Sequence, residues 1–246
     1  MDIPKHFVIR ESSHRVLNPI EPSQLATLGA ALRLPRDTTV LDLACGKGEL
    51  LCTWARDHGI TGTGVDLSTA FLSDAHDRAA ELGVADRVAF VHGDAGGYVA
   101  DTPVDVVACI GATWIGGDTP GTVRLMEQSG GRLLLVGDVY WRADPPPEAV
   151  EAIFGDLHGA DCLSLPGQVE RFHDLGYDVV EMITADERGW DRYAAASWLN
   201  LRQWLDANPD DELVPEIRSE LTRSQLQHVR WQRPYLGWGI FALMRC

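Results

Sequence analysis

The sequence VLDLACGKG, at residues 40–48, is an apolar run that leads into a glycine turn. The next residues, 49–58, have the pattern of a helix. A helix that begins at such a turn offers unpaired backbone N–H groups to polar ligand atoms. Gly46 and Gly48 have no Cβ, so the backbone can bend sharply and a ligand can lie against it. The stretch therefore predicts a ligand-binding turn in an α/β protein, a feature shared by many nucleotide-binding proteins.

Two acids follow at the ends of the next expected strands. Asp66, in GVDLS, ends the strand expected at 61–65 and lies 20 residues after Gly46. In a doubly wound sheet a carboxylate at this position can accept hydrogen bonds from both hydroxyls of a ribose. Asp94, in VHGDA, follows the third expected strand, where it can accept a hydrogen bond from an adenine amino group. Together with the glycine turn, these acids favour a nucleoside ligand.

Strand and helix patterns alternate along most of the chain, which favours a parallel sheet covered on both faces. Strands are expected at 38–43, 61–65, 87–91, 104–110, 132–136, 178–184 and 236–244, and helices at 22–34, 49–58, 68–82, 122–128 and 167–175, with two or more helices in 186–230. We expect one domain over residues 1–246, made of a helical cap (1–35), a core (36–185), a helical insertion (186–230) and a closing strand (231–246).

Composition narrows the possible partners. The net charge is −15, with 36 acidic against 21 basic residues, which disfavours a nucleic-acid substrate. Five cysteines with no CxxC pair and no zinc-ligand spacing favour a reducing, cytoplasmic setting over disulfides or a structural metal. No apolar run approaches the length of a membrane span. The oligomeric state is left open by the sequence.

A dinucleotide is one alternative ligand for the glycine turn. The GxGxxG spacing of dinucleotide-binding proteins would place its third glycine where this chain has Glu49, and a glutamate beside a pyrophosphate would repel it. A ligand without phosphate meets no such objection, and an ammonium group could be attracted to Asp42. This reasoning prefers S-adenosylmethionine to a dinucleotide.

The series VLDLACGKG, GVDLS, VHGDA and DVVACIGATW, spread over roughly residues 36–140, resembles the class I S-adenosylmethionine-dependent methyltransferases. Ala44 stands where that family most often has glycine. The resemblance implies a Rossmann-like, doubly wound α/β sheet of seven strands, the last antiparallel, with the helical insertion placed before the last strand. It also implies S-adenosylmethionine as the cofactor, in a site lined by Asp42, Ala44, Gly46, Asp66, Leu67, Asp94, Ala95 and Gly111.

Shorter pieces, SSHRVLNP, GATWIGG, GDVYWR, GWDRY and YLGWG, resemble a bacterial subgroup of small-molecule methyltransferases. In that subgroup we expect Glu-Pro where this chain has Asp138-Val139. Four aromatic residues are candidates for the acceptor site, where they could exclude water and stack on a substrate, or could merely pack a lid. These candidates are Trp114, Tyr140, Trp141 and Trp190.

Methyl transfer from a sulfonium needs alignment above all, and it needs a base only when the acceptor arrives protonated. The candidates for such a base are His14, Tyr140 and Asp138. The segment after the fourth expected strand carries no Asn-Pro-Pro-Tyr-type motif, which argues against amide or adenine N-methylation. The sequence therefore predicts a small-molecule methyltransferase. A non-catalytic or regulatory protein that binds S-adenosylmethionine remains an alternative.

Overall fold

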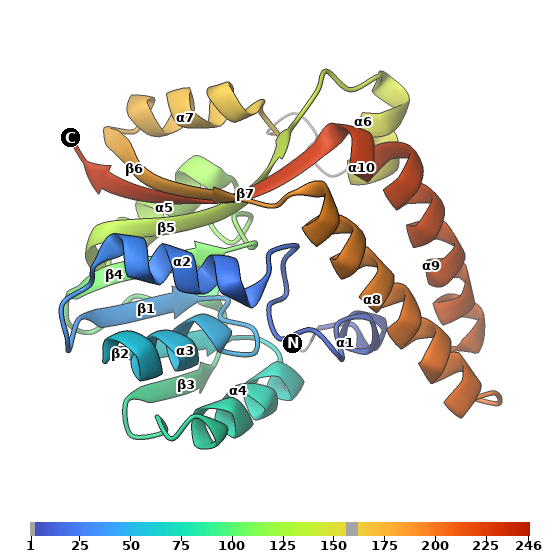
Figure 1. The fold of residues 1–246 in the computed structure, drawn as a ribbon, viewed down its shortest axis with the longest axis horizontal. Coiled ribbons are helices and arrows are strands. Elements are labelled where there is room, and N and C mark those ends of the chain that lie inside the picture. Colours follow the sequence, from blue (N-terminus) through green and yellow to red (C-terminus); the bar gives the residue numbers. More distant parts are fainter. Residues whose placement is uncertain (1–2, 156–161) are drawn as a thin grey trace.

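A seven-stranded sheet forms the centre of the computed structural model, which describes residues 3–155 and 162–246 (Figure 1). The strand order is β3-β2-β1-β4-β5-β7-β6, and β7 runs antiparallel to both of its neighbours. The strands are β1 (Thr39–Leu43), β2 (Thr61–Asp66), β3 (Val88–His92), β4 (Val104–Ile110), β5 (Gly130–Trp141), β6 (Tyr177–Thr184) and β7 (Leu236–Arg245). The doubly wound sheet with an antiparallel last strand is therefore confirmed.

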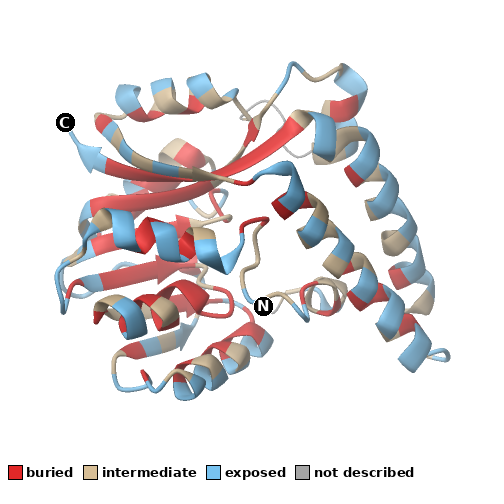
Figure 2. Ribbon diagram, viewed as in Figure 1, coloured by how far each residue is buried: buried red, intermediate tan, exposed pale blue. Residues whose placement is uncertain are grey.

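Helices cover both faces of the sheet, whose strands are mostly buried while the helices alternate between buried and exposed residues (Figure 2). One face packs against α2 (Pro22–Leu32), α3 (Glu49–His58) and α4 (Thr69–Glu81). The other packs against α5 (Thr119–Glu127) and α7 (Leu165–Asp174). Because the central strands are buried on both faces, they are mostly apolar instead of alternating regularly with polar residues.

The helix ends near the ligand edge of the sheet follow from local chemistry. Ser68 caps α4, since its hydroxyl accepts a hydrogen bond from the Phe71 N–H at 3.2 Å. Asp118 caps α5 in the same way, through the Gly121 N–H at 2.6 Å. Both caps fix the chain where it leaves the carboxyl end of a strand, which is where ligands bind in such sheets.

A separate helical unit lies beside the sheet and contacts the N-terminal segment (Figure 1). It consists of α8 (Glu187–Ala207) and α9 (Val214–Gln227), divided at the predicted break near residues 208–209, with short helices at His228–Gln232 and Arg233–Tyr235 leading into β7. Ile9 of α1 (Lys5–Arg10) packs with Leu201, Leu205 and Ile217 of this unit. From here on, the cap means residues 3–20, which is the part of the expected helical cap (1–35) that precedes α2 and that the structure describes.

Three elements differ from the expected ones, and one of them is the helix at residues 147–154, where none was predicted. The fifth strand does not end at residue 136 but continues to Trp141, because β7 pairs with it as far as Trp141 and Leu236. Helix α1 was not expected, because its residues show no strong apolar periodicity and become ordered by packing against α8. Helix α6 (Pro147–Phe154) begins at the last of the three consecutive prolines. Within the described residues, none of the helices is long and apolar enough to cross a membrane.

Candidate functional site

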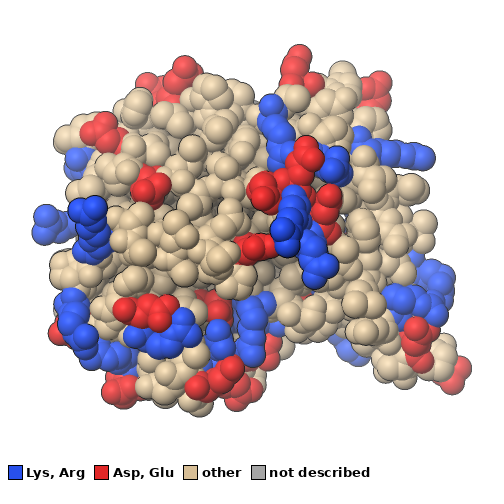
Figure 3. Space-filling view, viewed as in Figure 1, with Lys and Arg blue, Asp and Glu red and all other residues tan. Residues whose placement is uncertain are grey.

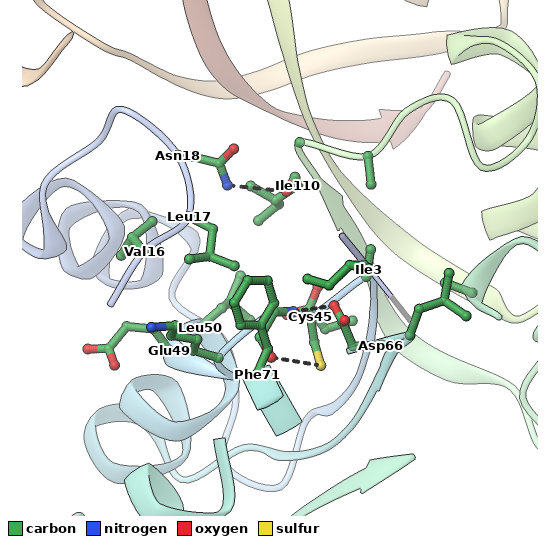
Figure 4. Close-up of a pocket in the computed structure, with 18 of the residues that line it drawn as sticks. Ile3, Val16, Leu17, Asn18, Cys45, Glu49, Leu50, Asp66, Phe71 and Ile110 are labelled. Atoms are coloured by element: carbon green, nitrogen blue, oxygen red, sulfur yellow. Dashed lines mark hydrogen bonds between the residues drawn. The ribbon is translucent and has the colours of Figure 1, made fainter. Parts of the chain in front are cut away.

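A cavity of about 260 Å³ lies at the carboxyl ends of β1, β2 and β4, under the cap (Figure 4). We call it the first cavity. All the residues that the sequence suggested for a cofactor site line it, namely Asp42, Ala44, Gly46, Asp66, Leu67, Asp94, Ala95 and Gly111. Their roles toward a ligand are taken up below as a proposal.

The glycine turn has a backbone that few side chains tolerate. Ala44, Gly46 and Gly48 all have positive φ, at 58°, 54° and 68°. A Cβ on Gly46 would lie 2.8 Å from Cδ1 of Leu17, so the cap packs directly on the turn. The left-handed conformation at Ala44 is one that glycine adopts with less strain than alanine.

Asp66 is held in one orientation at the end of β2. Its Oδ2 accepts a hydrogen bond from the Gly46 N–H at 2.8 Å, and its Oδ1 accepts one from the Ser68 N–H at 2.8 Å. The side chain is 8% exposed and lines the first cavity. Each carboxylate oxygen can accept more than one hydrogen bond, so the oriented carboxylate keeps acceptor capacity at the cavity wall.

The far end of the first cavity is apolar with one polar acceptor. Leu67 is 37% exposed although it lines the cavity, so it is not an ordinary core residue. Ala95 is buried in the same wall, and Asp94 accepts a hydrogen bond from the Gly96 N–H at 2.9 Å through Oδ1. This combination suits a flat ring with a donor group at its edge.

Asp42 places a carboxyl group in the buried part of the first cavity. Burial, and then the neighbouring charge of Asp66, raise the pKa of Asp42 to about 8. A positively charged ligand group beside Asp42 would favour the ionised form and would relieve this penalty. The site therefore fits a ligand that carries a cation.

Glu49 does not act as the sequence reasoning assumed. Its two carboxylate oxygens each accept a hydrogen bond from Arg78, both at 2.8 Å, in a buried bidentate pair. Because Arg78 neutralises this carboxylate, repulsion of a pyrophosphate by Glu49 has little force. The distinction between a dinucleotide and S-adenosylmethionine therefore depends on other evidence.

The cap supplies walls of the first cavity that the sequence did not identify. In Figure 4, Leu17 and Asn18 lie over the site, and the Asn18 side-chain amide donates to the Ile110 carbonyl at 3.3 Å. Lys47, within the glycine turn, donates to the carbonyls of Glu11 and Ser12, both at 3.0 Å. The turn and the cap are thus tied together. A lysine inside a glycine-rich turn was the only sequence signal of this link.

A second cavity of about 600 Å³ opens beside the first, and the two share Gly111 and Trp114. Its walls come from the loop after β4, the start of α5, the end of β5, α6 and β7. They are Gly111, Thr113, Trp114, Gly117, Asp118, Thr119, Asp138, Val139, Phe154, Cys162 and Trp238. Trp114 is 70% exposed and stands at the rim of both cavities.

Asp138, a predicted catalytic residue, and Trp114, a predicted substrate residue, both lie in the walls of the second cavity. Tyr140 does not line either cavity: it is buried against Gly237 of β7, and burial raises the pKa of its hydroxyl. Trp141 packs edge-on against Phe154, with ring centroids 5.5 Å apart, and lies behind this cavity residue.

The other two predicted residues lie elsewhere. Trp190 is 8% exposed and belongs to the core beneath the cap. His14 contacts the Tyr193 carbonyl through Nε2 at 3.1 Å and lies 3.2 Å from Glu11 Oε2 through Nδ1. The structure therefore brings neither Trp190 nor His14 to the walls of the two cavities.

Comparisons with known proteins identify the ligand class. Residues 40–128 match the family model described as "Methyltransferase domain". A solved structure of an S-adenosylmethionine-dependent methyltransferase from Geobacter sulfurreducens, in complex with S-adenosyl-L-homocysteine, is 56% identical and superposes with a TM-score of 0.95, covering 100% of this chain and 99% of that chain. This chain belongs to the S-adenosylmethionine-dependent methyltransferases.

Two further relatives match this methyltransferase over nearly its whole length. A methyltransferase structure from Thiobacillus denitrificans, also in complex with S-adenosyl-L-homocysteine, is 54% identical with a TM-score of 0.95, and the two chains cover each other fully. The protein YjhP of Escherichia coli K12 is 52% identical over 246 residues, 99% of each chain. The cofactor is S-adenosylmethionine.

Proposed function

We propose that this methyltransferase transfers the methyl group to a small-molecule acceptor bound in the second cavity. The observation that carries the proposal is the shared wall: Gly111 and Trp114 line both cavities, so molecules bound in the two would meet there. A volume of about 600 Å³ is in the range of small-ligand sites. Three aromatic side chains, Trp114, Phe154 and Trp238, are among the walls and would limit the access of water to a bound acceptor.

We assign the first cavity to the cofactor residue by residue. Asp66 accepts hydrogen bonds from the ribose hydroxyls, while Leu67 and Ala95 pack on the adenine and Asp94 accepts from its amino group. Asp42 lies beside the positively charged amino-acid end. This assignment is supported by the orientation of Asp66, the exposure of Leu67 and the raised pKa of Asp42.

The glycine turn and the strand-four turn complete the cofactor assignment. Ala44 and Gly46 leave the backbone of the first turn open to the cofactor, and Gly111 does the same at the carboxyl end of β4. Gly111 has a φ of 87°, and a Cβ there would collide with Asn18 of the cap. The absence of a side chain at Gly111 therefore lets Asn18 of the cap lie against the wall that the two cavities share.

The cofactor supplies an activated methyl group on a sulfonium, so the chain contributes mainly alignment and exclusion of water. Trp114, which is largely exposed, stands at the rim of the second cavity. Thr113 and Thr119 are hydrogen-bond partners of the Asp138 carboxylate in its wall. If the acceptor arrives protonated, Asp138 is the residue that we propose as its base, because neither Tyr140 nor His14 lines the second cavity.

The proposal is tested by incubating the protein with S-adenosylmethionine and a panel of amines, phenols, thiols and carboxylic acids, and measuring S-adenosylhomocysteine release. The Asp66→Ala variant is the inactive control. Turnover with at least one acceptor is expected, and so is its loss on Phe154→Ala without a change in cofactor affinity, because Phe154 lines the second cavity and not the first. Cofactor binding with no turnover on any member would instead favour a non-catalytic, regulatory protein.

A cytoplasmic location is also part of the proposal. All five cysteines, Cys45, Cys52, Cys109, Cys162 and Cys246, are free. Free thiols are typical of a reducing compartment. On the face shown in Figure 3, the basic side chains lie in small groups among acidic ones, which suits a small-molecule substrate better than a polyanion.

A further inference from the structure

The second cavity has an acidic lining with no compensating base among its described residues. Its two ionisable acids are Asp118 and Asp138, and its described walls contain no lysine, arginine or histidine. Asp118 caps α5 through the Gly121 N–H and is already engaged there. Both carboxylates give the cavity negative charge, and Asp138, at the end of β5, is the one that we consider as the partner of an acceptor.

Asp138 lies near the end of β5, and hydrogen-bond donors orient both of its carboxylate oxygens. Its Oδ2 accepts a hydrogen bond from the Thr119 hydroxyl at 2.7 Å, and its Oδ1 accepts one from the Val139 N–H at 2.8 Å. Thr113 is a further hydrogen-bond partner. These donors stabilise the ionised carboxylate and fix its orientation, whereas burial acts in the opposite direction and raises its pKa.

Arg171 of α7 supplies a compensating charge from outside the cavity. It is close enough to lower the pKa of Asp138, but it is not among the residues that line the cavity. An anion in the cavity would therefore meet Asp138 before it met a cation. A carboxylate or phosphate acceptor would be repelled.

Three aromatic rings surround the same space. Trp238 is buried and Phe154 half-buried in the wall, and Trp114 stands exposed at the rim. The negative faces of such rings attract cations, and tryptophan does so most strongly. A carboxylate combined with tryptophan rings is a combination that favours organic cations over neutral molecules of the same shape.

We propose that the acceptor, bound as in the proposed function on which this inference rests, is an organic cation whose charged nitrogen pairs with Asp138 and lies against Trp114 or Trp238. Asp138 is thus a specificity-determining residue that selects small amines or amidines. As the base proposed above, it takes the N–H proton while the nitrogen forms its bond to the methyl group and the bond between the methyl group and the sulfur breaks. Acceptors whose charge is negative are excluded by the same carboxylate.

The test uses three probes of nearly equal shape: benzylamine, benzyl alcohol and benzoate. Their binding to the full-length protein saturated with S-adenosylhomocysteine is followed by NMR titration. We expect benzylamine to bind about tenfold to a hundredfold more tightly than benzyl alcohol, with benzoate weakest. Failure of all three to bind, or benzoate binding as well as benzylamine, would overturn the proposal.

Variants connect the preference to one residue. Asp138→Asn keeps the shape and is expected to abolish the preference for benzylamine, whereas Asp118→Asn, in the same cavity, is expected to retain it. Trp114→Leu is the second variant, at an exposed position where folding is not at risk, and is expected to weaken benzylamine more than benzyl alcohol. A preference that survives both Asp138→Asn and Trp114→Leu contradicts the proposal.

The acceptor panel that tests the proposed function, made of amines, phenols, thiols and carboxylic acids, also separates this inference from that function. Methylation of neutral or anionic acceptors only would refute the cation inference and leave the small-molecule methyltransferase intact. Absence of methyl transfer to every acceptor, with S-adenosylhomocysteine still binding, would refute the proposed function. Preferential methylation of amines would support both.

Discussion

The first cavity takes most of its walls from one continuous part of the chain, residues 42–115, and the second takes its walls from places as far apart as Thr119, Asp138 and Trp238. The first depends on backbone geometry, with left-handed residues in the turn and acids at strand ends. The second depends on which side chains meet after β5 and β7 have paired. A cofactor common to a family can be held by the first kind of site, whereas the second kind can change with single side chains.

The largest expected effect is the loss of cofactor affinity on substitution of Asp66, which lines the first cavity and not the second. Asp66→Ala should weaken cofactor binding by roughly a hundredfold, because charge-assisted hydrogen bonds to two hydroxyls are lost, as measured by calorimetry. Asp105→Ala is the matched control: this acid accepts two hydrogen bonds from Thr39, both at 2.9 Å, at the opposite end of the sheet. Equal losses in both variants would mean that Asp66 acts only on folding.

Gly111 tests the shared wall. Gly111→Ala forces a left-handed alanine with its Cβ against Asn18, and we expect a loss of about 2–3 kcal/mol of unfolding free energy with impaired binding in both cavities. Gly83→Ala is the control for backbone strain alone, since φ is 67° and nothing lies within 4 Å of the place that a Cβ would occupy. It should cost about 1 kcal/mol by chemical denaturation. Similar costs for the two variants would contradict the close approach of the cap.

The pH dependence of cofactor affinity tests the acid in the first cavity. The pKa of Asp42 is about 8 in the free protein, and a cation bound beside it lowers that pKa, so binding releases a proton. Affinity should therefore rise as the pH rises toward about 8, by at most about tenfold per pH unit, and should level off above it. Calorimetry in buffers of different ionisation enthalpy measures the released proton, and Asp42→Asn should flatten the profile. A flat profile in the unmodified protein would show that the cation lies elsewhere.

The smallest expected effect concerns Ala44. Ala44→Gly relieves a left-handed alanine at φ 58°, partly offset by the greater entropy of glycine in the unfolded chain. We expect a stability change between about 0 and +1 kcal/mol, with cofactor binding retained. Ala80→Gly, on the exposed side of α4, should destabilise by about 1 kcal/mol. Destabilisation by both would remove backbone strain as the reason for the family's glycine.

The same comparison explains what the sequence could predict. Local signals in the sequence predicted the sheet, the start of α4 at Ser68 and the residues of the first cavity. These signals are strand ends, glycines and helix starts. Tyr140 and Trp141 were expected beyond the end of a strand because the apolar run weakens after Val136. They lie within β5 because β7, about a hundred residues later, pairs with them, and no local pattern encodes that register.

Side chains that reach a site from a distance were also missed. Trp238 and Thr119 are ordinary strand and helix-start residues in the sequence, and only their positions beside Asp138 make them walls of the second cavity. Leu17 and Asn18 belong to a segment without periodicity, and it is their packing on glycines that places them over the first cavity. The role of Glu49 was predicted wrongly because its partner, Arg78, comes from a different helix.

The link from Lys47 to the carbonyls of Glu11 and Ser12 has a thermodynamic consequence. In the proposed cofactor assignment, the cap and the cofactor both contact the same turn, so the free energy that one gains from the other is reciprocal. If ordering of the cap raises the binding constant of the cofactor by some factor, binding of the cofactor raises the equilibrium constant for ordering the cap by the same factor. Protection of residues 3–20 from a protease therefore becomes a measure of cofactor occupancy, and an N-terminal fusion that strains this segment would be felt as weaker cofactor binding.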